Sequence, residues 1–257
     1  MKDHGVSDLD IARADAVMNI GVLSNTVPST FWILFELYSR PDLLQSVRAE
    51  VEQNACTVDH GTGVHSIDLS LIKSKCPLVV SAFQEVLRVR SNGIPIRMIY
   101  EDVLLDDTYL LKAGSILQMP ASAINKEETF WGLRGKEFNI AHFGTSEQTT
   151  GASDSPRIKP RATSYMSFGA SPNLCPGRHF AAAEILSLVA MLVLRVDIKP
   201  TANEWWTPRL NPRALAASIT PPAEDYHVTI HQRDRYKGMR WSYTVSEGKD
   251  KFGLITG

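Results

Sequence analysis

A single cysteine, Cys175, stands between a loop and a strongly apolar segment, and this junction constrains the fold of the chain more than any other feature. The loop reads Phe-Gly-Ala-Ser-Pro-Asn-Leu-Cys-Pro-Gly over residues 168–177, and the apolar residues that follow predict a helix over about 176–195. Pro176 suits the first helical position, where no backbone N–H is needed. Because a helix N-terminus carries free N–H groups and a positive dipole end, the sequence predicts a thiolate there that can act as a metal ligand.

This loop resembles the haem-binding loop of the cytochrome P450 monooxygenases, whose pattern is Phe-x-x-Gly-x-x-x-Cys-x-Gly. Phe168, Cys175 and Gly177 match the pattern. Ser171 stands where the pattern has glycine, and Asn173 stands where a propionate-binding Arg or His is usual. The resemblance implies a haem whose iron is held by the Cys175 thiolate, a ligand that favours cleavage of the O–O bond. It also implies that Phe168, Asn173 and Gly177 lie beside the haem. The alternative is a buried structural cysteine.

A second motif lies in a helix predicted over about 77–90. Proline can open this helix, and Glu85 and Arg88 are three residues apart, so they share one helix face. An ordinary solvated pair at this spacing would add only about 0.2–0.5 kcal/mol. In the P450 family, Glu-x-x-Arg lies under the haem and pairs with an arginine of a later Phe-x-Pro-x-Arg-Phe segment. That segment here resembles Phe-Asn-Ile-Ala-His-Phe over 138–143, which makes His142 the expected third member.

The helical spacing of apolar residues near the N-terminus predicts a long helix over about 8–39. Ser7 or Asp8 can cap its start. Pro28 falls inside this helix and cannot donate to the carbonyl of Ser24, so we expect the turn to open or kink there.

This segment resembles the long P450 helix that crosses over the haem and carries an acid–alcohol pair beside bound dioxygen. The acid is replaced by Asn25, and the alcohol is kept as Thr26. Asparagine cannot relay a proton as a carboxylate can, but it can orient water. Thr26 could instead bond back to its own helix. Asparagine here, followed by a proline and then Phe-Trp, is most similar to the branch that contains the sterol 7α-hydroxylases and prostacyclin synthase.

Arg97 lies in a predicted strand just after the Glu-x-x-Arg helix. A P450 arginine at this place often reaches a haem propionate, and a guanidinium fits a carboxylate with two hydrogen bonds. The alternative is a strand arginine that faces solvent. A structural zinc site is a rival interpretation of Cys56, His60 and His65, and of Cys175 with His179, because zinc uses such ligands. The first cluster has no fourth partner and no paired cysteines, so zinc is the weaker interpretation.

The remaining pattern predicts a mainly helical chain with small antiparallel sheets, as in the C-terminal part of the P450 fold. A charged helix is expected over 42–55, a loop over 59–66 and a polar surface loop over 144–163. Short strands are expected over 95–100, 103–105, 109–111 and 115–119, with a turn at 106–107. The C-terminal strands are expected over about 219–245.

Composition narrows the classes of protein and partner. The chain has 257 residues, of which 44% are hydrophobic and 21% charged, as in an ordinary globular protein. A net charge of −1 argues against nucleic acid as the main partner. Three cysteines make no disulfide framework, which favours a reducing intracellular compartment. The most apolar segment, 180–194, contains Glu184 and falls short of the ~20 residues of a membrane span, although P450 relatives are usually anchored to the endoplasmic reticulum membrane.

The resemblance implies a haem-thiolate monooxygenase that inserts one atom of dioxygen into a lipophilic substrate such as a sterol or another lipid-like molecule. No dinucleotide fingerprint is present, so electrons would come from an external donor such as an NADPH-dependent reductase. Two alternatives stay open. One is a haem-thiolate isomerase that rearranges a lipid peroxide without a reductase, and the other is a non-catalytic remnant with no productive haem.

The resemblance covers the whole chain but only the C-terminal half of the P450 fold. Met1 is therefore expected to be an internal position of a longer ancestor, through a truncated gene model or a degraded paralogue. We expect the apolar faces around Phe31, Trp32 and Phe35 to be incompletely covered, which favours association. The chain on its own is accordingly expected to be poorly soluble or haem-deficient, and inactive toward lipids.

Overall fold

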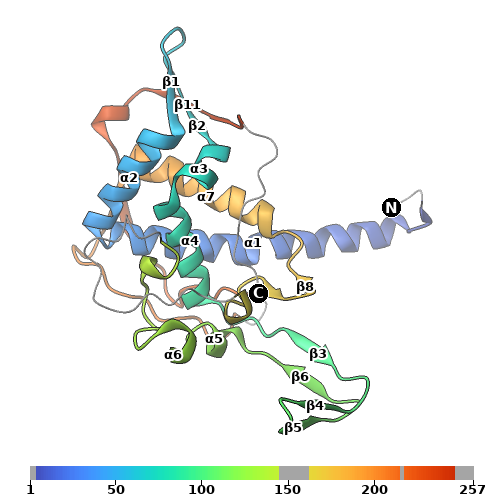
Figure 1. Cartoon of the computed structure of the whole chain (residues 1–257). Helices are drawn as coiled ribbons and strands as arrows, with labels where there is room; N and C mark the ends of the chain where they lie inside the picture. Colours follow the sequence, from blue (N-terminus) through green and yellow to red (C-terminus); the bar gives the residue numbers. More distant parts are fainter. Residues whose placement is uncertain (1–3, 145–161, 215–216, 247–257) are drawn as a thin grey trace.

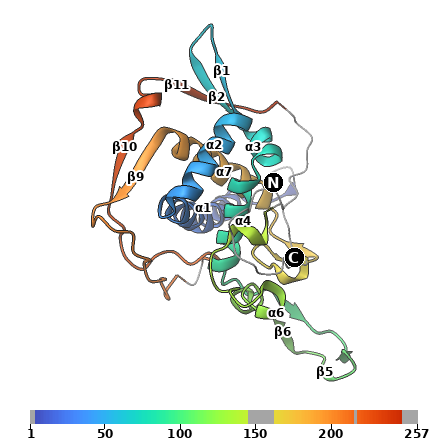
Figure 2. The ribbon, with the colours of Figure 1, turned by 60° about the vertical axis from the view of Figure 1, so that its left-hand side comes forward.

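Four helices form the centre of the molecule in a computed structural model that describes residues 4–144, 162–214 and 217–246. They are α1 (Asp8–Tyr38), α2 (Pro41–Ala55), α4 (Pro77–Arg90) and α7 (Arg178–Arg195). Figure 1 shows α1 crossing the molecule against α4 and α7, with its first half projecting beyond them, and Figure 2 shows the same helix nearly end-on. The short helix α3 (Leu69–Lys75) joins the second strand to α4.

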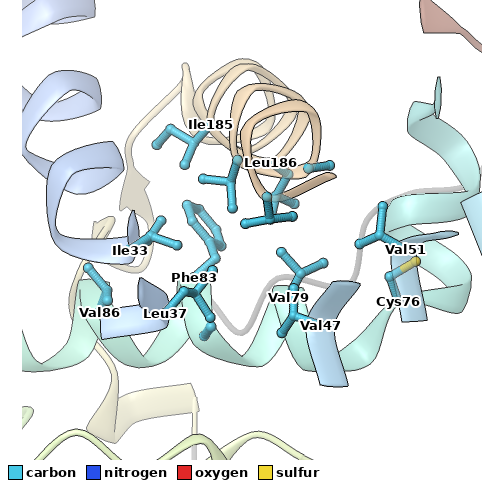
Figure 3. Packing of buried hydrophobic residues seen from close by; sticks show 14 of the residues in the cluster. Ile33, Leu37, Val47, Val51, Cys76, Val79, Phe83, Val86, Ile185 and Leu186 are labelled. Atoms are coloured by element: carbon cyan, nitrogen blue, oxygen red, sulfur yellow. The ribbon is translucent and has the colours of Figure 1, made fainter. Parts of the chain in front are cut away.

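The core lies where these helices meet. Ile33, Phe83 and Leu186, from α1, α4 and α7, are each at most 1% exposed and point into one apolar cluster (Figure 3). Burying such a side chain stabilises the fold by about 1.5–3 kcal/mol. The periodicity that predicted these helices is thus the periodicity of their buried faces.

The boundaries of α1 and α4 have local causes. Ser7 caps α1, because its hydroxyl oxygen accepts a hydrogen bond from the Asp10 N–H at 3.1 Å, and the helix stays continuous through Pro28. Pro77 opens α4. The carboxylate of Glu50, on α2, accepts hydrogen bonds from two N–H groups in the first turn of α4, so one helix caps the next.

The aromatic residues of α1 are better covered than expected. Trp32 is fully buried and Phe35 is 6% exposed, whereas Phe31 is only half-buried, so cover is incomplete at Phe31 and complete at the other two rings. The C-terminal segment supplies the cover, because the rings of Trp205 and Tyr226 pack against Phe35 at centroid distances of 5.7 and 5.8 Å. Exposed apolar side chains lie instead on the projecting half of α1: Val17, Met18, Ile20, Leu23 and Val27.

The strands form small sheets around the helices. The strands β3 (Ile96–Met98) and β6 (Ile116–Gln118) pair antiparallel, as do β4 (Val103–Leu105) and β5 (Tyr109–Leu111). The turn between β4 and β5 forms at the expected place, and both of its central residues have positive φ, 51° for Asp106 and 48° for Asp107. A hairpin whose two central residues are left-handed matches strand twist.

Two further sheets include strands from the C-terminal part of the chain. The strands β9 (Val196–Pro200) and β10 (Val228–Gln232) are antiparallel. The strands β1 (Cys56–Asp59) and β2 (Val64–Asp68) form a hairpin, and β11 (Arg240–Thr244) pairs parallel with β2. The loop predicted over 59–66 is therefore wrong: its glycines make only the turn, and the third strand that completes the sheet comes from far along the chain.

The remaining elements are short. They are β7 (Gly169–Ala170), β8 (Asn173–Leu174), α5 (Ala121–Ile124), α6 (Glu128–Trp131), η2 (Ile140–His142), η3 (Ala162–Ser164) and η4 (Asp234–Tyr236). A mainly helical chain with small antiparallel sheets is thus confirmed, with one parallel pair. Most of the polar loop predicted over 144–163 lies outside the described residues. Within the described ranges, every helix is too short or too polar to cross a bilayer.

Candidate active site

A cavity of about 700 Å³ lies between α1 and the cysteine loop. Its lining includes Asn25 and Thr26 of α1 together with Cys175 and Gly177 of the loop. Phe168, Arg97 and Asn173 also line it. The structure thus brings together, from segments 150 residues apart in the chain, every predicted site residue except Glu85, Arg88 and His142.

The cysteine loop is built as a very short hairpin. Strands β7 and β8 pair antiparallel, and the N–H of Cys175 donates to the carbonyl of Phe168 at 2.7 Å. Gly169 has a φ of 96°, and a Cβ there would lie 2.8 Å from the carbonyl oxygen of Asn173. Only glycine fits this place without a shift, so the tight return of the chain at Gly169 sets the position of Cys175.

The surroundings of the sulfur are open on the cavity side. Cys175 is exposed and unpaired, and the helix α7 begins at Arg178, two residues later than the sequence predicted. A Cβ added at Gly177 would have the Cys175 Sγ as its nearest neighbour, at 4.0 Å. The absence of a side chain at Gly177 therefore leaves the space beside the sulfur uncovered.

Arg97 connects strand β3 to this loop. Its Nη2 donates to the carbonyl oxygens of Ala170 and Ser171, at 2.5 and 3.0 Å, and its Nη1 donates to the carbonyl of Ile96 at 2.8 Å. The side chain is therefore bound to the protein rather than free in solvent. It holds the loop and at the same time places a positive charge at the wall of the cavity.

On the α1 wall, most side-chain hydroxyls bond back to the helix. Thr26 Oγ1 donates to the carbonyl of Val22, and Ser29 Oγ donates to the carbonyl of Asn25 at 2.6 Å. Asn25 differs, because its side-chain oxygen accepts the N–H of Ile219 at 3.1 Å. The bond of Thr26 is the local one that the residue type allows, and it leaves the hydroxyl oxygen able to accept another hydrogen bond.

Glu85, Arg88 and His142 lie together in the protein interior, outside the lining of the cavity. Glu85 and Arg88 are both fully buried, and Arg88 donates to both carboxylate oxygens, at 2.8 and 2.6 Å. His142 Nδ1 lies 3.0 Å from the same carboxylate. Burial alone would raise the pKa of Glu85, but hydrogen bonds and charge from Arg88 and His142 outweigh it and hold this pKa below its ordinary value. The pair is not an ordinary solvated helix pair.

Arg88 reaches further than its carboxylate partner. It donates to the carbonyls of Asn125, Gly135 and Glu137, and its guanidinium lies 4.7 Å from the centre of the Trp131 ring. The buried cation is thus satisfied mostly by backbone oxygens of the segment between β6 and η2. Removing it would leave several buried carbonyls without a partner.

Asn125 is a buried residue that the sequence reasoning missed. Its side-chain oxygen accepts the N–H of Met166 at 2.8 Å, and its amide donates to the carbonyl of Arg88 at 3.3 Å and to Ser167 Oγ at 3.2 Å. It therefore links the Glu85–Arg88 helix to the residues that lead into the cysteine loop. A single asparagine after a short helix has no pattern around it that would have identified this role.

The zinc alternative finds no support in the geometry. His65 packs between aromatic rings, with centroids 5.8 Å from Tyr236 and 5.0 Å from Trp241. Within the ranges that the structure describes, no three histidine, cysteine or carboxylate groups come together as a metal site. We therefore assign no metal-binding role to Cys56 or His60.

Known proteins of one family are similar to this chain over most of its length. The family model described as Cytochrome P450 matches residues 1–225. The cytochrome P450 monooxygenase nodJ of Hypoxylon pulicicidum is 45% identical over 99% of this chain and 50% of its own length. The cholesterol 7-alpha-monooxygenase of Cricetulus griseus is 25% identical over 85% of this chain and 44% of its own. The 25-hydroxycholesterol 7-alpha-hydroxylase of Rattus norvegicus is 27% identical over 93% and 57%. The chain spans about half the length of these relatives.

Proposed function

Because the chain belongs to the cytochrome P450 family, we propose that it is a haem-thiolate monooxygenase whose iron ligand is Cys175. The observation that carries this proposal is the cavity that Cys175 shares with Asn25 and Thr26. When bound there, haem would supply the activation of dioxygen and the insertion of one oxygen atom into the substrate. The residues present fit the group, because an exposed sulfur faces the cavity beside a residue with no side chain.

Around the haem, the proposed roles follow from the chemistry of each side chain. The Cys175 thiolate would hold the iron, and Gly177 would leave room beside it. Arg97 would attract a propionate, since a guanidinium that already donates to two carbonyls is fixed in place and still positive. Asn173, in place of the usual basic residue, would offer an amide N–H in place of a charge.

On the opposite wall, Thr26 would order water. Its hydroxyl hydrogen points at the carbonyl of Val22, so its oxygen is available to accept a hydrogen bond from a water in the cavity. Asn25 has no proton to give or take near neutral pH, but its amide N–H can orient water. Proton delivery at this wall would therefore run through water held by Thr26 Oγ1, without a carboxylate.

Glu85, Arg88 and His142 would support the haem from below without touching it. Their buried network joins α4 to the segment before η2, and Asn125 extends it to the residues that precede Phe168. A loop fixed at that end keeps its sulfur in one place. In this proposal the three residues are structural and Cys175 is the ligand.

The proposed substrate is a lipophilic molecule such as a sterol. The support is the similarity to relatives named for cholesterol 7-alpha-monooxygenase and 25-hydroxycholesterol 7-alpha-hydroxylase activity. The proposed electron donor is an external NADPH-dependent reductase on the reducing intracellular side, at the endoplasmic reticulum membrane. A second role as an isomerase has no observation of its own in its favour.

The test is turnover of cholesterol with a P450 reductase, NADPH and isotopically labelled dioxygen, by a haem-loaded chimaera that joins this chain to the part of the Hypoxylon pulicicidum relative that it does not cover. We expect one labelled oxygen atom in the product of the chimaera, no product when NADPH is left out, and no turnover by the 257 residues alone. Consumption of a fatty-acid peroxide without NADPH would point to the isomerase instead. A haem-loaded chimaera that transforms neither substrate class under either condition would contradict the proposal.

A further inference from the structure

Residues 218–220 form a short stretch of extended chain that is held from two sides. On the α4 side, Ile219 makes an isolated antiparallel bridge with Ser91. The N–H of Thr220 donates to the carbonyl of Arg90 at 3.3 Å, and the N–H of Asn92 donates to the carbonyl of Ser218 at 2.8 Å. The stretch therefore lies along the end of α4 as a strand would, without belonging to any sheet.

On the other side, α1 holds the same stretch with two side chains. The indole N–H of Trp32 donates to the carbonyl of Thr220 at 2.8 Å, and Asn25 Oδ1 accepts the N–H of Ile219 at 3.1 Å. Trp32 is fully buried and lies under the guanidinium of Arg90, 3.7 Å from its ring centre. Thr220 is thus fixed in the core, and the N–H of Ile219 is held by Asn25 at the edge of the cavity.

The position of this stretch matters because it forms part of the cavity wall. Ser218 and Ile219 both line the cavity, as do Asn25 and Thr26. Gly93 lets this wall lie close to the chain that follows α4, because a Cβ there would lie only 3.3 Å from Ser218 Oγ. Any shift of Ile219 would therefore change the space available next to the cysteine loop.

We propose that Asn25 is a positioning residue for substrate selection, which fixes Ile219 through its side-chain oxygen. This inference rests on the proposed function and deepens it, because it assigns the asparagine a task other than proton transfer. The N–H of Ile219 is a donor at an apolar wall, and a neutral amide oxygen satisfies it without bringing a charge into the cavity. The aliphatic side chain of Ile219 then sets the shape of lipophilic molecules that fit beside the haem.

The direct test is residue-resolved amide hydrogen exchange, which needs no haem. In the wild-type protein the amide of Ile219 should be protected, and Asn25→Ala or the volume-conserving Asn25→Leu should speed its exchange about threefold to tenfold. Asn25→Asp keeps an acceptor oxygen and should restore slow exchange. The amide of Thr220, which donates to Arg90, should change less. The matched control is Asn19→Ala, an exposed asparagine of the same helix.

Three results would overturn the inference. They are an unprotected Ile219 amide in the wild type, unchanged exchange in Asn25→Leu, and Asn25→Asp behaving like Asn25→Ala. The first needs no variant, so the inference stays testable even if the variants fail to fold.

Selectivity gives the second readout, by optical titration of the haem-loaded protein with imidazole and with 4-phenylimidazole. Asn25→Leu should change the ratio of the two dissociation constants by at least about threefold, and Asn19→Ala should leave it near the wild-type value. An unchanged ratio in Asn25→Leu contradicts the selective role. A wild-type protein that shows no thiolate-ligated haem spectrum even with haem added in excess contradicts the proposed function instead, while the exchange result still decides whether Asn25 holds Ile219.

Discussion

Arg88 donates a hydrogen bond of 2.6 Å to Glu85 in an interior where both side chains are fully buried. The two residues stand three apart on α4, a spacing that on a helix surface contributes a few tenths of a kcal/mol. In the interior the cost of breaking the pair is larger, because each charge has lost its hydration and is compensated by its partner. The spacing predicts the contact between Glu85 and Arg88, whereas the segment between β6 and η2 that buries them determines how much the pair contributes to stability.

Removing either partner should therefore be costly. Glu85→Ala and Arg88→Ala are each expected to lower the free energy of unfolding by about 3–5 kcal/mol, measured by urea denaturation. Arg13→Ala is the control, since Arg13 pairs with Asp10 at the same spacing but is 69% exposed. The control should change stability by less than about 0.5 kcal/mol. Equal effects in the buried and the exposed pair would contradict this prediction.

Acid should weaken the fold through Glu85. The pKa of Glu85 is held low in the folded state, so its stabilisation is present above the ordinary glutamate pKa and is lost as pH falls through the lowered folded value. We expect a falling free energy of unfolding on the acid side, and a shallower fall in Glu85→Gln. If the free energy of unfolding falls equally steeply with acid in the wild type and in Glu85→Gln, titration of Glu85 is not the cause.

The titration of Glu50 should lower the free energy of unfolding as pH rises, which is opposite to the effect of Glu85. Burial raises its pKa to about 7, although hydrogen bonds from the N–H groups of Leu78 and Val79 lower it in part. The folded state then holds the proton more tightly than the unfolded state, so stability falls as pH rises from about 4.5 to about 7. After allowance for solvent screening, the loss is on the order of 2 kcal/mol. Glu50→Gln should remove this slope, and an unchanged slope in urea denaturation at several pH values would be evidence against it.

Valine variants at Thr26 and Thr30 distinguish a role of the Thr26 hydroxyl in ordering water from a purely structural role in its helix. Thr26→Val should raise the fraction of NADPH electrons lost as hydrogen peroxide several-fold in the haem-loaded protein with a reductase, and Thr26→Ser should restore the wild-type fraction. Thr30→Val is the control, because Thr30 bonds back to the carbonyl of Thr26 at 2.9 Å without lining the cavity. If both valine variants lose electrons equally, the hydroxyl of Thr26 only stabilises its helix.

Much of the fold was predictable because its signals are local. Apolar periodicity marks the helices, proline marks the start of α4, and Asp106 and Asp107 mark a tight hairpin turn. The expected positions of Cys175, Asn25 and Thr26 come from motifs that are each confined to one segment. Their meeting in one cavity needs the packing of α1 against α7 as well.

The missed features depend on contacts between distant parts of the chain. The strand pairing of β2 with β11 and the cover that Trp205 and Tyr226 give to Phe35 both join segments far apart in sequence. The hydrogen bond from Ile219 to Asn25 crosses 194 positions. Neither partner has a pattern that points to the other, so such bonds emerge only from the folded arrangement.

The central claim is that the thiolate of Cys175 holds the haem iron, and the most direct measurement is the absorption spectrum of the ferrous carbonyl complex, recorded with haem added in excess. The wild-type protein should show the strongly red-shifted Soret band of thiolate ligation. Cys56→Ala and Cys76→Ala, which alter cysteines outside the cavity, should keep this band, and Cys175→Ala should lose it. A red-shifted band that survives in Cys175→Ala would contradict the claim.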